Sequence, residues 1–239
     1  MFFKYLSNKN KLKHIGIIMD GNRRWAKSNN ISILEAYEQG LETLNDTINN
    51  FIKLKIQYLT VFGFSTENWR RSKKEISFLM QLFNKFLDKA ILEAEDNEIR
   101  IKFIGDLEVF GKKIKEKASL ISKLTNKKKK LTLTIAVNYG GRQEIFIAVK
   151  NYLTDHLNNN IKSLKNLNDF EKYLFNYKFP NIDLLIRTGG EKRLSNFMLW
   201  HIAYTELIFL NQMWPDFNFK LLESSINEFI SRKRKFGGM

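Results

Sequence analysis

Short, unbroken apolar runs alternate with longer stretches of helical spacing, and this alternation constrains the fold more than any other feature of the sequence. The runs cover residues 14–20, 58–64, 100–105, 131–137, 183–187 and 206–210. An apolar run without polar alternation suits a strand that is buried on both faces, as in a parallel sheet. The pattern therefore predicts an α/β domain with a mainly parallel sheet flanked by helices.

The stretches between the runs predict helices near 33–55, 72–97, 107–124, 142–158, 168–176 and 219–233. Within 72–97, apolar residues recur at helical spacing, as expected for a helix with one buried face. The sequence has only two prolines and no low-complexity linker. We therefore predict one domain over residues 1–239, with 1–12 as a loose N-terminal segment.

The chain carries 40 Lys and Arg against 25 Asp and Glu, a net charge of +15. Such a charge predicts an anionic partner, which is a nucleic acid, an acidic lipid or a phosphorylated small molecule. The absence of cysteine excludes disulfides and thiol chemistry. The start of the chain does not resemble a secretory signal, and no apolar run reaches about 18 residues, so we expect a soluble, cytoplasmic protein.

Polar segments, three of which contain glycine, follow four of the predicted strands. They cover residues 20–25, 65–71, 138–142 and 187–196, and each contains arginine. In open parallel sheets, ligands bind beyond the carboxyl ends of the strands, where these segments would converge. Arginine side chains and backbone N–H groups are the usual means of holding phosphate. The chain has no GxxxxGK[ST], GxGxxG, HExxH or DDxxD motif, so the segments predict a polyphosphate site of another kind.

Asp20 follows the first strand and is the first candidate ligand for a magnesium ion. Magnesium usually takes one or two protein carboxylates together with substrate phosphate and water. Glu206, at the start of the last strand, is the second candidate. We predict that residues 21–24 wrap a phosphate group as a turn and that Trp25 packs this turn or covers a substrate.

These segments resemble the signature segments of the cis-prenyltransferases, above all the bacterial undecaprenyl diphosphate synthases. The matching segments read HIGIIMDGNRRWAK, FGFSTENWRR, NYGGRQEI and RTGGEKRLSNFMLWHIAYTEL. The resemblance extends from about Lys13 to Phe236, which is nearly the whole chain.

The resemblance implies a homodimer whose monomer is a six-stranded, mainly parallel sheet with an apolar tunnel. It also implies Mg²⁺-dependent cis-condensation of isopentenyl diphosphate onto an allylic diphosphate, farnesyl diphosphate. The implied product is undecaprenyl diphosphate, the precursor of the lipid carrier of cell-wall synthesis. We accordingly expect no nucleic-acid partner, and a transient contact with the inner face of the membrane for product release.

The resemblance also implies roles for individual residues. Asp20 and Glu206 would bind the metal, and Asn68 would help to remove the proton from isopentenyl diphosphate. Arg187, Arg193 and Ser195 would hold the isopentenyl diphosphate group. The remaining implied substrate contacts are Gly21, Asn22, Arg23, Arg24, Trp25, Ser65, Thr66, Glu67, Trp69, Arg71 and Leu194.

The chain departs from the family pattern at three positions. Ile33 and Tyr37 stand where the family usually has an arginine and a histidine, so the allylic diphosphate would lose positive contacts there. Lys192 stands where some members have a histidine near the metal. These departures leave open which ligands complete the coordination of the metal and how tightly the allylic diphosphate, the primer of the reaction, is bound. They do not call the reaction into question.

Two other function classes fit parts of the sequence. The charge and the interleaved aromatic residues also suit a nucleic-acid-binding module, although the arginines lie in separate loops beside carboxylates rather than along one helix. A non-catalytic family subunit is the other alternative. The presence of Asp20, Asn68 and Arg193 argues against it.

Overall fold

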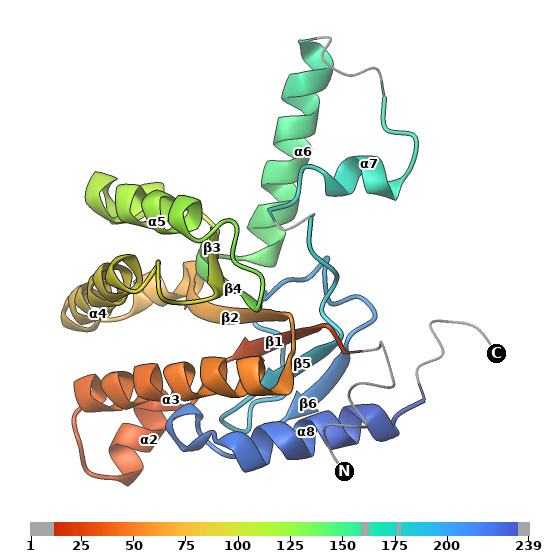
Figure 1. Cartoon of the computed structure of the whole chain (residues 1–239). Helices are drawn as coiled ribbons and strands as arrows, with labels where there is room; N and C mark the ends of the chain where they lie inside the picture. Colours follow the sequence, from red (N-terminus) through yellow and green to blue (C-terminus); the bar gives the residue numbers. More distant parts are fainter. Residues whose placement is uncertain (1–11, 159–162, 176–177, 234–239) are drawn as a thin grey trace.

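The computed structural model describes residues 12–158, 163–175 and 178–233, and its centre is a six-stranded sheet (Figure 1). The strand order is β3-β4-β2-β1-β5-β6, and every adjacent pair is parallel. The predicted mainly parallel sheet is thus confirmed. The strands are β1 (His14–Ile18), β2 (Tyr58–Ser65), β3 (Ile99–Ile104), β4 (Leu131–Tyr139), β5 (Leu184–Arg187) and β6 (Glu206–Phe209).

Helices connect the strands and cover the sheet. The α-helices are α2 (Asn22–Ser28), α3 (Ile33–Leu54), α4 (Lys73–Leu92), α5 (Lys112–Leu124), α6 (Gly141–Leu157), α7 (Leu167–Glu171) and α8 (Phe219–Ser231). Short 3₁₀ helices are η1 (Thr66–Arg70), η2 (Glu108–Phe110) and η3 (Trp214–Asp216). Helices α3, α4, α5 and α8 lie together in Figure 1, whereas α6 projects away from the sheet.

The main core fills the space between the sheet and the layer of α3, α4, α5 and α8. Side chains from the central strands, such as Ile15, Leu59 and Leu133, meet Phe51 of α3 there. Burying one such side chain contributes about 1.5–3 kcal/mol. A smaller cluster around Phe197 lies on the other face of the sheet. Both faces of the strands are therefore buried, which explains the unbroken apolar runs.

Residues 22–25 differ from the sequence-based prediction, because they form the start of α2, three residues after β1 ends, instead of a turn. Gly21 precedes the helix with φ 113°, a conformation that favours glycine. A Cβ atom at this position would lie 2.8 Å from Cβ of Met213. The close packing of Gly21 on Met213 lets the chain turn sharply from the strand into the helix.

The predicted loose segment 1–12 falls, except for its last residue, outside the described part of the chain. Of the helices that the structure describes, none combines the length and the apolar composition needed to cross a bilayer.

Candidate active site

A cavity of about 900 Å³ opens at the carboxyl ends of the strands, where the sequence predicts the ligand site. Its inner wall is apolar and comes from α3, α4, β2 and β4. The residues of this wall include Leu41, Leu44, Val61, Phe64, Leu79, Phe83, Phe86, Ile135 and Val137. Its other end is polar and carries arginines and carboxylates. The cavity thus offers a charged end and an apolar end to one ligand.

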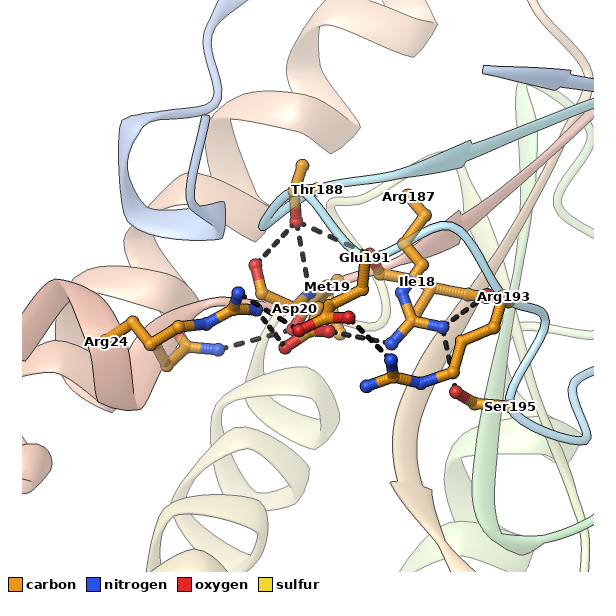
Figure 2. Close-up of polar contacts among 10 residues, drawn as sticks. Ile18, Met19, Asp20, Arg24, Arg187, Thr188, Glu191, Arg193 and Ser195 are labelled. Carbon is orange, nitrogen blue, oxygen red and sulfur yellow. Dashed lines mark hydrogen bonds and ion pairs between the residues drawn. The ribbon is translucent and has the colours of Figure 1, made fainter. Parts of the chain in front are cut away.

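Charges of alternating sign form a chain at the polar end of the cavity (Figure 2). Arg193 Nη1 lies 2.5 Å from Glu191 Oε2, and the other Glu191 oxygen lies 3.3 Å from Arg24 Nη1. Arg24 Nη2 lies 3.3 Å from Asp20 Oδ1, and Asp20 Oδ2 lies 2.8 Å from Arg187 Nη2. Each carboxylate thus holds two cations in place at the cavity mouth.

Arg187 is the buried member of this chain, with a side chain only 4% exposed. Its Nη1 donates to Ser195 Oγ at 2.8 Å and to the backbone carbonyl of Arg193. A buried cation is stable only where it is paired and hydrogen-bonded. Asp20 therefore has a structural role toward Arg187 besides any role toward a ligand.

Thr188 fixes the backbone of Asp20. Its hydroxyl accepts from the Asp20 N–H at 3.0 Å and donates to the Asp20 carbonyl at 2.8 Å. The next residue, Gly189, has φ 86°, and a Cβ atom there would lie 2.8 Å from Nη2 of Arg24. These contacts join the ends of β1 and β5, and they set the direction of the Asp20 carboxylate.

The segment after β2 contributes the other polar side of the cavity. Asn68 Oδ1 accepts from the Ser65 N–H at 3.0 Å, and Asn196 Nδ2 donates to Glu67 Oε1 at 3.2 Å. Partial burial acts to raise the pKa of Glu67, but hydrogen bonds, including that from Asn196, outweigh it and hold the pKa below its ordinary value. Glu67 is therefore ionised at neutral pH.

Most of the residues predicted from the sequence line this cavity together. They are Asp20, Gly21, Asn22, Arg23, Arg24, Ser65, Glu67, Asn68, Arg71, Arg187, Arg193 and Ser195. Thr66, Leu194, Trp25 and Trp69 do not line it. The two tryptophans instead donate their ring N–H groups to protein oxygens, Trp25 to Asp216 at 2.7 Å and Trp69 to Asn138 at 2.8 Å.

Glu206 does not lie at the cavity. It begins β6 and pairs in register with Leu184, the first residue of β5, whereas Asp20 follows the opposite end of the neighbouring strand β1. Along the four residues of β5 this places them about 10 Å apart or more. Glu206 Oε2 lies 2.9 Å from Arg232 Nη1 instead. Within one chain Asp20 and Glu206 therefore lie apart, and the prediction that Glu206 is a second magnesium ligand stays a prediction.

The three departures from the family pattern have different surroundings. Ile33 and Lys192 do not line the cavity, whereas Tyr37 does. The Tyr37 hydroxyl donates to Glu75 Oε1 at 2.7 Å and accepts from Arg71 Nη1 at 2.6 Å.

Sequence reasoning missed Glu191, Thr188 and Glu75 as parts of the site. Glu191 stands between two arginine-containing stretches in RTGGEKR, and this placement could have indicated a carboxylate that pairs with arginines. Nothing in the sequence pattern marks the contact of Thr188 with Asp20 or that of Glu75 with Tyr37, because these partners lie in distant segments.

The carboxylates of Asp20 and Glu191 give the cavity the oxygen ligands that magnesium prefers. In the ranges that the structure describes, no three His, Cys, Asp or Glu side chains gather into a metal-binding group. A magnesium ion here would take its other ligands from substrate oxygens and water, as this ion commonly does.

Residues 18–237 match the family model described as "Putative undecaprenyl diphosphate synthase". An isoprenyl transferase of Helicobacter pylori is 43% identical over 228 residues, which are 95% of this chain and 97% of the relative. An isoprenyl transferase of Neisseria meningitidis is 42% identical, over 94% of this chain and 89% of the relative.

Two solved structures share the fold. Lavandulyl diphosphate synthase from Lavandula x intermedia, in complex with dimethylallyl diphosphate, has a TM-score of 0.90 and 32% identity. That alignment covers 95% of this chain and 98% of the other. A "probable undecaprenyl diphosphate synthase" from Campylobacter jejuni has a TM-score of 0.79 and 33% identity, and the alignment covers 96% and 100% of the two chains.

Proposed function

Since this chain belongs to the undecaprenyl diphosphate synthase family of isoprenyl transferases, we propose that it extends farnesyl diphosphate by repeated cis-condensation with isopentenyl diphosphate. The proposed product is undecaprenyl diphosphate. One observation carries the proposal, namely a single cavity that joins a cluster of arginines to a long apolar wall. A prenyl diphosphate has the same two parts, a diphosphate anion and an apolar chain.

The arginines would hold two diphosphate groups side by side. Arg23 and Arg24 of α2 would bind the allylic diphosphate, and Arg187, Arg193 and Ser195 would bind isopentenyl diphosphate. In the free protein most of these cations pair with Asp20 or Glu191. Substrate phosphates would replace part of these contacts with charge-assisted hydrogen bonds to the same guanidinium groups.

We propose that magnesium binds beside Asp20 and the allylic diphosphate. Bound there, it supplies positive charge that stabilises the leaving diphosphate. The arginines stabilise the same developing charge from preset positions, which is often the largest contribution to catalysis. Holding both substrates also aligns the isopentenyl double bond with the allylic carbon. Asn68, which the Ser65 N–H holds in place, would assist removal of the proton that closes the condensation.

The proposed function is tested with purified full-length protein, farnesyl diphosphate, radiolabelled isopentenyl diphosphate and Mg²⁺. We expect labelled lipids that grow by five carbons at a time, no product after chelation of the metal with EDTA, and recovery when Mg²⁺ is added back. A protein that binds farnesyl diphosphate but yields no labelled lipid under any divalent cation would contradict the proposal.

A second copy of the chain is the proposed partner, with α6 in the interface. Helix α6 presents an apolar stripe of Phe146, Val149, Leu153 and Leu157, whose outer residues Phe146 and Leu157 are 70% and 78% exposed. These residues share one helical face. Monomeric proteins seldom expose apolar side chains so close together, which supports burial of this stripe against another surface.

The dimer is expected to dissociate when charge is placed in the stripe. Light scattering should give twice the 28.3 kDa chain mass for the wild type and a smaller mass for Phe146→Glu combined with Leu153→Glu. Leu124→Glu changes a similarly exposed apolar residue of α5 and should leave the mass unchanged. A dimer that survives the α6 substitutions would place the interface elsewhere.

The apolar product must leave the cavity, and we propose that a transient contact with the cytoplasmic face of the membrane receives it. The net charge of +15 supports attraction to anionic lipid.

A further inference from the structure

Tyr37 is the centre of a small hydrogen-bond network at the wall of the cavity. Its hydroxyl donates to Glu75 Oε1 at 2.7 Å and accepts from Arg71 Nη1 at 2.6 Å. Arg71 Nη1 also lies 3.2 Å from the same Glu75 oxygen. The network joins α3, which carries Tyr37, to Arg71, the residue that follows η1, and to the first turn of α4.

The surroundings keep the Tyr37 hydroxyl protonated. Burial raises its pKa, and although Arg71 and Arg23 oppose this shift, the Glu75 carboxylate adds to it. The Glu75 side chain is itself only 7% exposed, and a buried carboxylate requires hydrogen-bond donors. The single hydroxyl proton of Tyr37 is thus used in the hydrogen bond to Glu75. A diphosphate group would receive no hydrogen bond from Tyr37 unless this bond broke.

In the part of the chain that the structure describes, Arg71 is held by only one of its guanidinium nitrogens. Within the described residues, its side-chain hydrogen bonds all come from Nη1, to Tyr37 and Glu75. The guanidinium group is planar and rigid, so anchoring one nitrogen restrains the direction of the remaining N–H donors. Arg71 lines the cavity, as do Tyr37 and Arg23. The free donors are therefore available at the cavity wall.

We propose that Tyr37 is a positioning residue for the allylic diphosphate, because together with Glu75 it presets Arg71 beside Arg23. The inference rests on the proposed function. The allylic subsite is favoured because Tyr37 belongs to α3, which packs on α2, the helix that carries Arg23 and Arg24. Arg193 and Ser195, the proposed isopentenyl contacts, follow β5 instead. The tyrosine thus compensates indirectly for the histidine that the family pattern has at this position.

Tyr37→Phe removes the hydroxyl and keeps the ring. We expect the dissociation constant for farnesyl diphosphate, measured by calorimetry, to rise about tenfold, the usual order for a lost hydrogen bond to a charged group. The KM for isopentenyl diphosphate should change less than twofold. Tyr173→Phe is the matched control, because that hydroxyl also donates to a carboxylate, Asp155 at 3.1 Å, away from the cavity. It should bind the primer like the wild type.

A double-mutant cycle separates positioning from general stability. If Tyr37 acts through Arg71, Tyr37→Phe should weaken primer binding less than twofold in an Arg71→Ala background. A tenfold loss that persists in that background would overturn the proposal, as would unchanged affinity in the single variant. Glu75→Gln is a second variant that should weaken primer binding in the same direction if Tyr37→Phe folds poorly. Unchanged primer affinity in Glu75→Gln would also overturn it.

Failure of the proposed function would be visible separately. A wild-type protein that binds farnesyl diphosphate without elongating it would contradict the proposed reaction, whereas the calorimetric cycle would still decide the role of Tyr37.

Discussion

Replacing Asp20 with alanine is expected to lower the rate of prenyl transfer by on the order of a thousandfold. The substitution removes the proposed magnesium ligand and two ion pairs that orient Arg24 and Arg187. Loss of one electrostatic stabiliser commonly costs about a hundred- to a thousandfold in turnover. Turnover is measured as incorporation of labelled isopentenyl diphosphate at saturating substrate. Asp46→Ala, an exposed aspartate of α3, is the control and should remain fully active.

The same substitution should also destabilise the fold, because Arg187 is left as a buried cation without its carboxylate. Breaking a buried pair in this way typically costs about 3–5 kcal/mol. The double variant Asp20→Ala with Arg187→Met removes the stranded charge. We expect it to regain thermal stability but not activity. If the double variant regained turnover, the loss in Asp20→Ala would come from instability, and the catalytic assignment of Asp20 would be rejected.

Arg193→Ala is expected to raise the KM for isopentenyl diphosphate about ten- to a hundredfold, with a much smaller effect on primer binding. The side chain is 62% exposed and stands at the outer end of the row of ion pairs at the cavity mouth. Its removal should therefore leave the fold intact. A hydrogen bond to a charged group is worth about 1.5–3 kcal/mol, which corresponds to this range. Initial rates are measured while one substrate is varied and the other is saturating.

Lys192→Ala is the matched control for Arg193. Lys192 is the adjacent residue, exposed and positively charged, but it does not line the cavity. Its removal changes the net charge by the same amount and should alter neither KM by more than twofold. If Arg193→Ala weakened the binding of both substrates equally, Arg193 would contribute to both diphosphate sites and not to that of isopentenyl diphosphate alone.

The strands could be predicted from the sequence because the central ones, such as β1, β4 and β5, are buried on both faces. The runs 58–64 and 131–137 differ from β2 and β4 by only one or two residues at one end. Helix α2 was missed because it follows Asp20-Gly21 and begins with Asn22, and Asp-Gly-Asn is a sequence more typical of a turn. Its stability depends on packing against α3 and Met213, which no local pattern reveals.

The candidate site was predictable where it depends on strand ends, since topology alone brings those segments together. The separation of Glu206 from the cavity follows from the same rule, because Glu206 begins β6 whereas ligands bind beyond the carboxyl ends of the strands. The hydrogen bond of Tyr37 could not be predicted from the sequence, because its partner Glu75 lies 38 residues away along the chain. Side-chain pairing between distant segments is the information that the sequence pattern lacks.

The contact between Asp20 and Arg187 spans 167 residues of sequence, because the central strand β1 lies beside β5. At a translation rate of about 5–20 residues per second, the ribosome adds Arg187 roughly 8–33 s after Asp20. During that interval one edge of the first strand has no partner, and such exposed edges favour aggregation. A nascent chain that stops before β5 lacks Arg187 and Arg193 and is therefore expected not to bind isopentenyl diphosphate, and chaperones would have to protect it until the last quarter emerges from the ribosome.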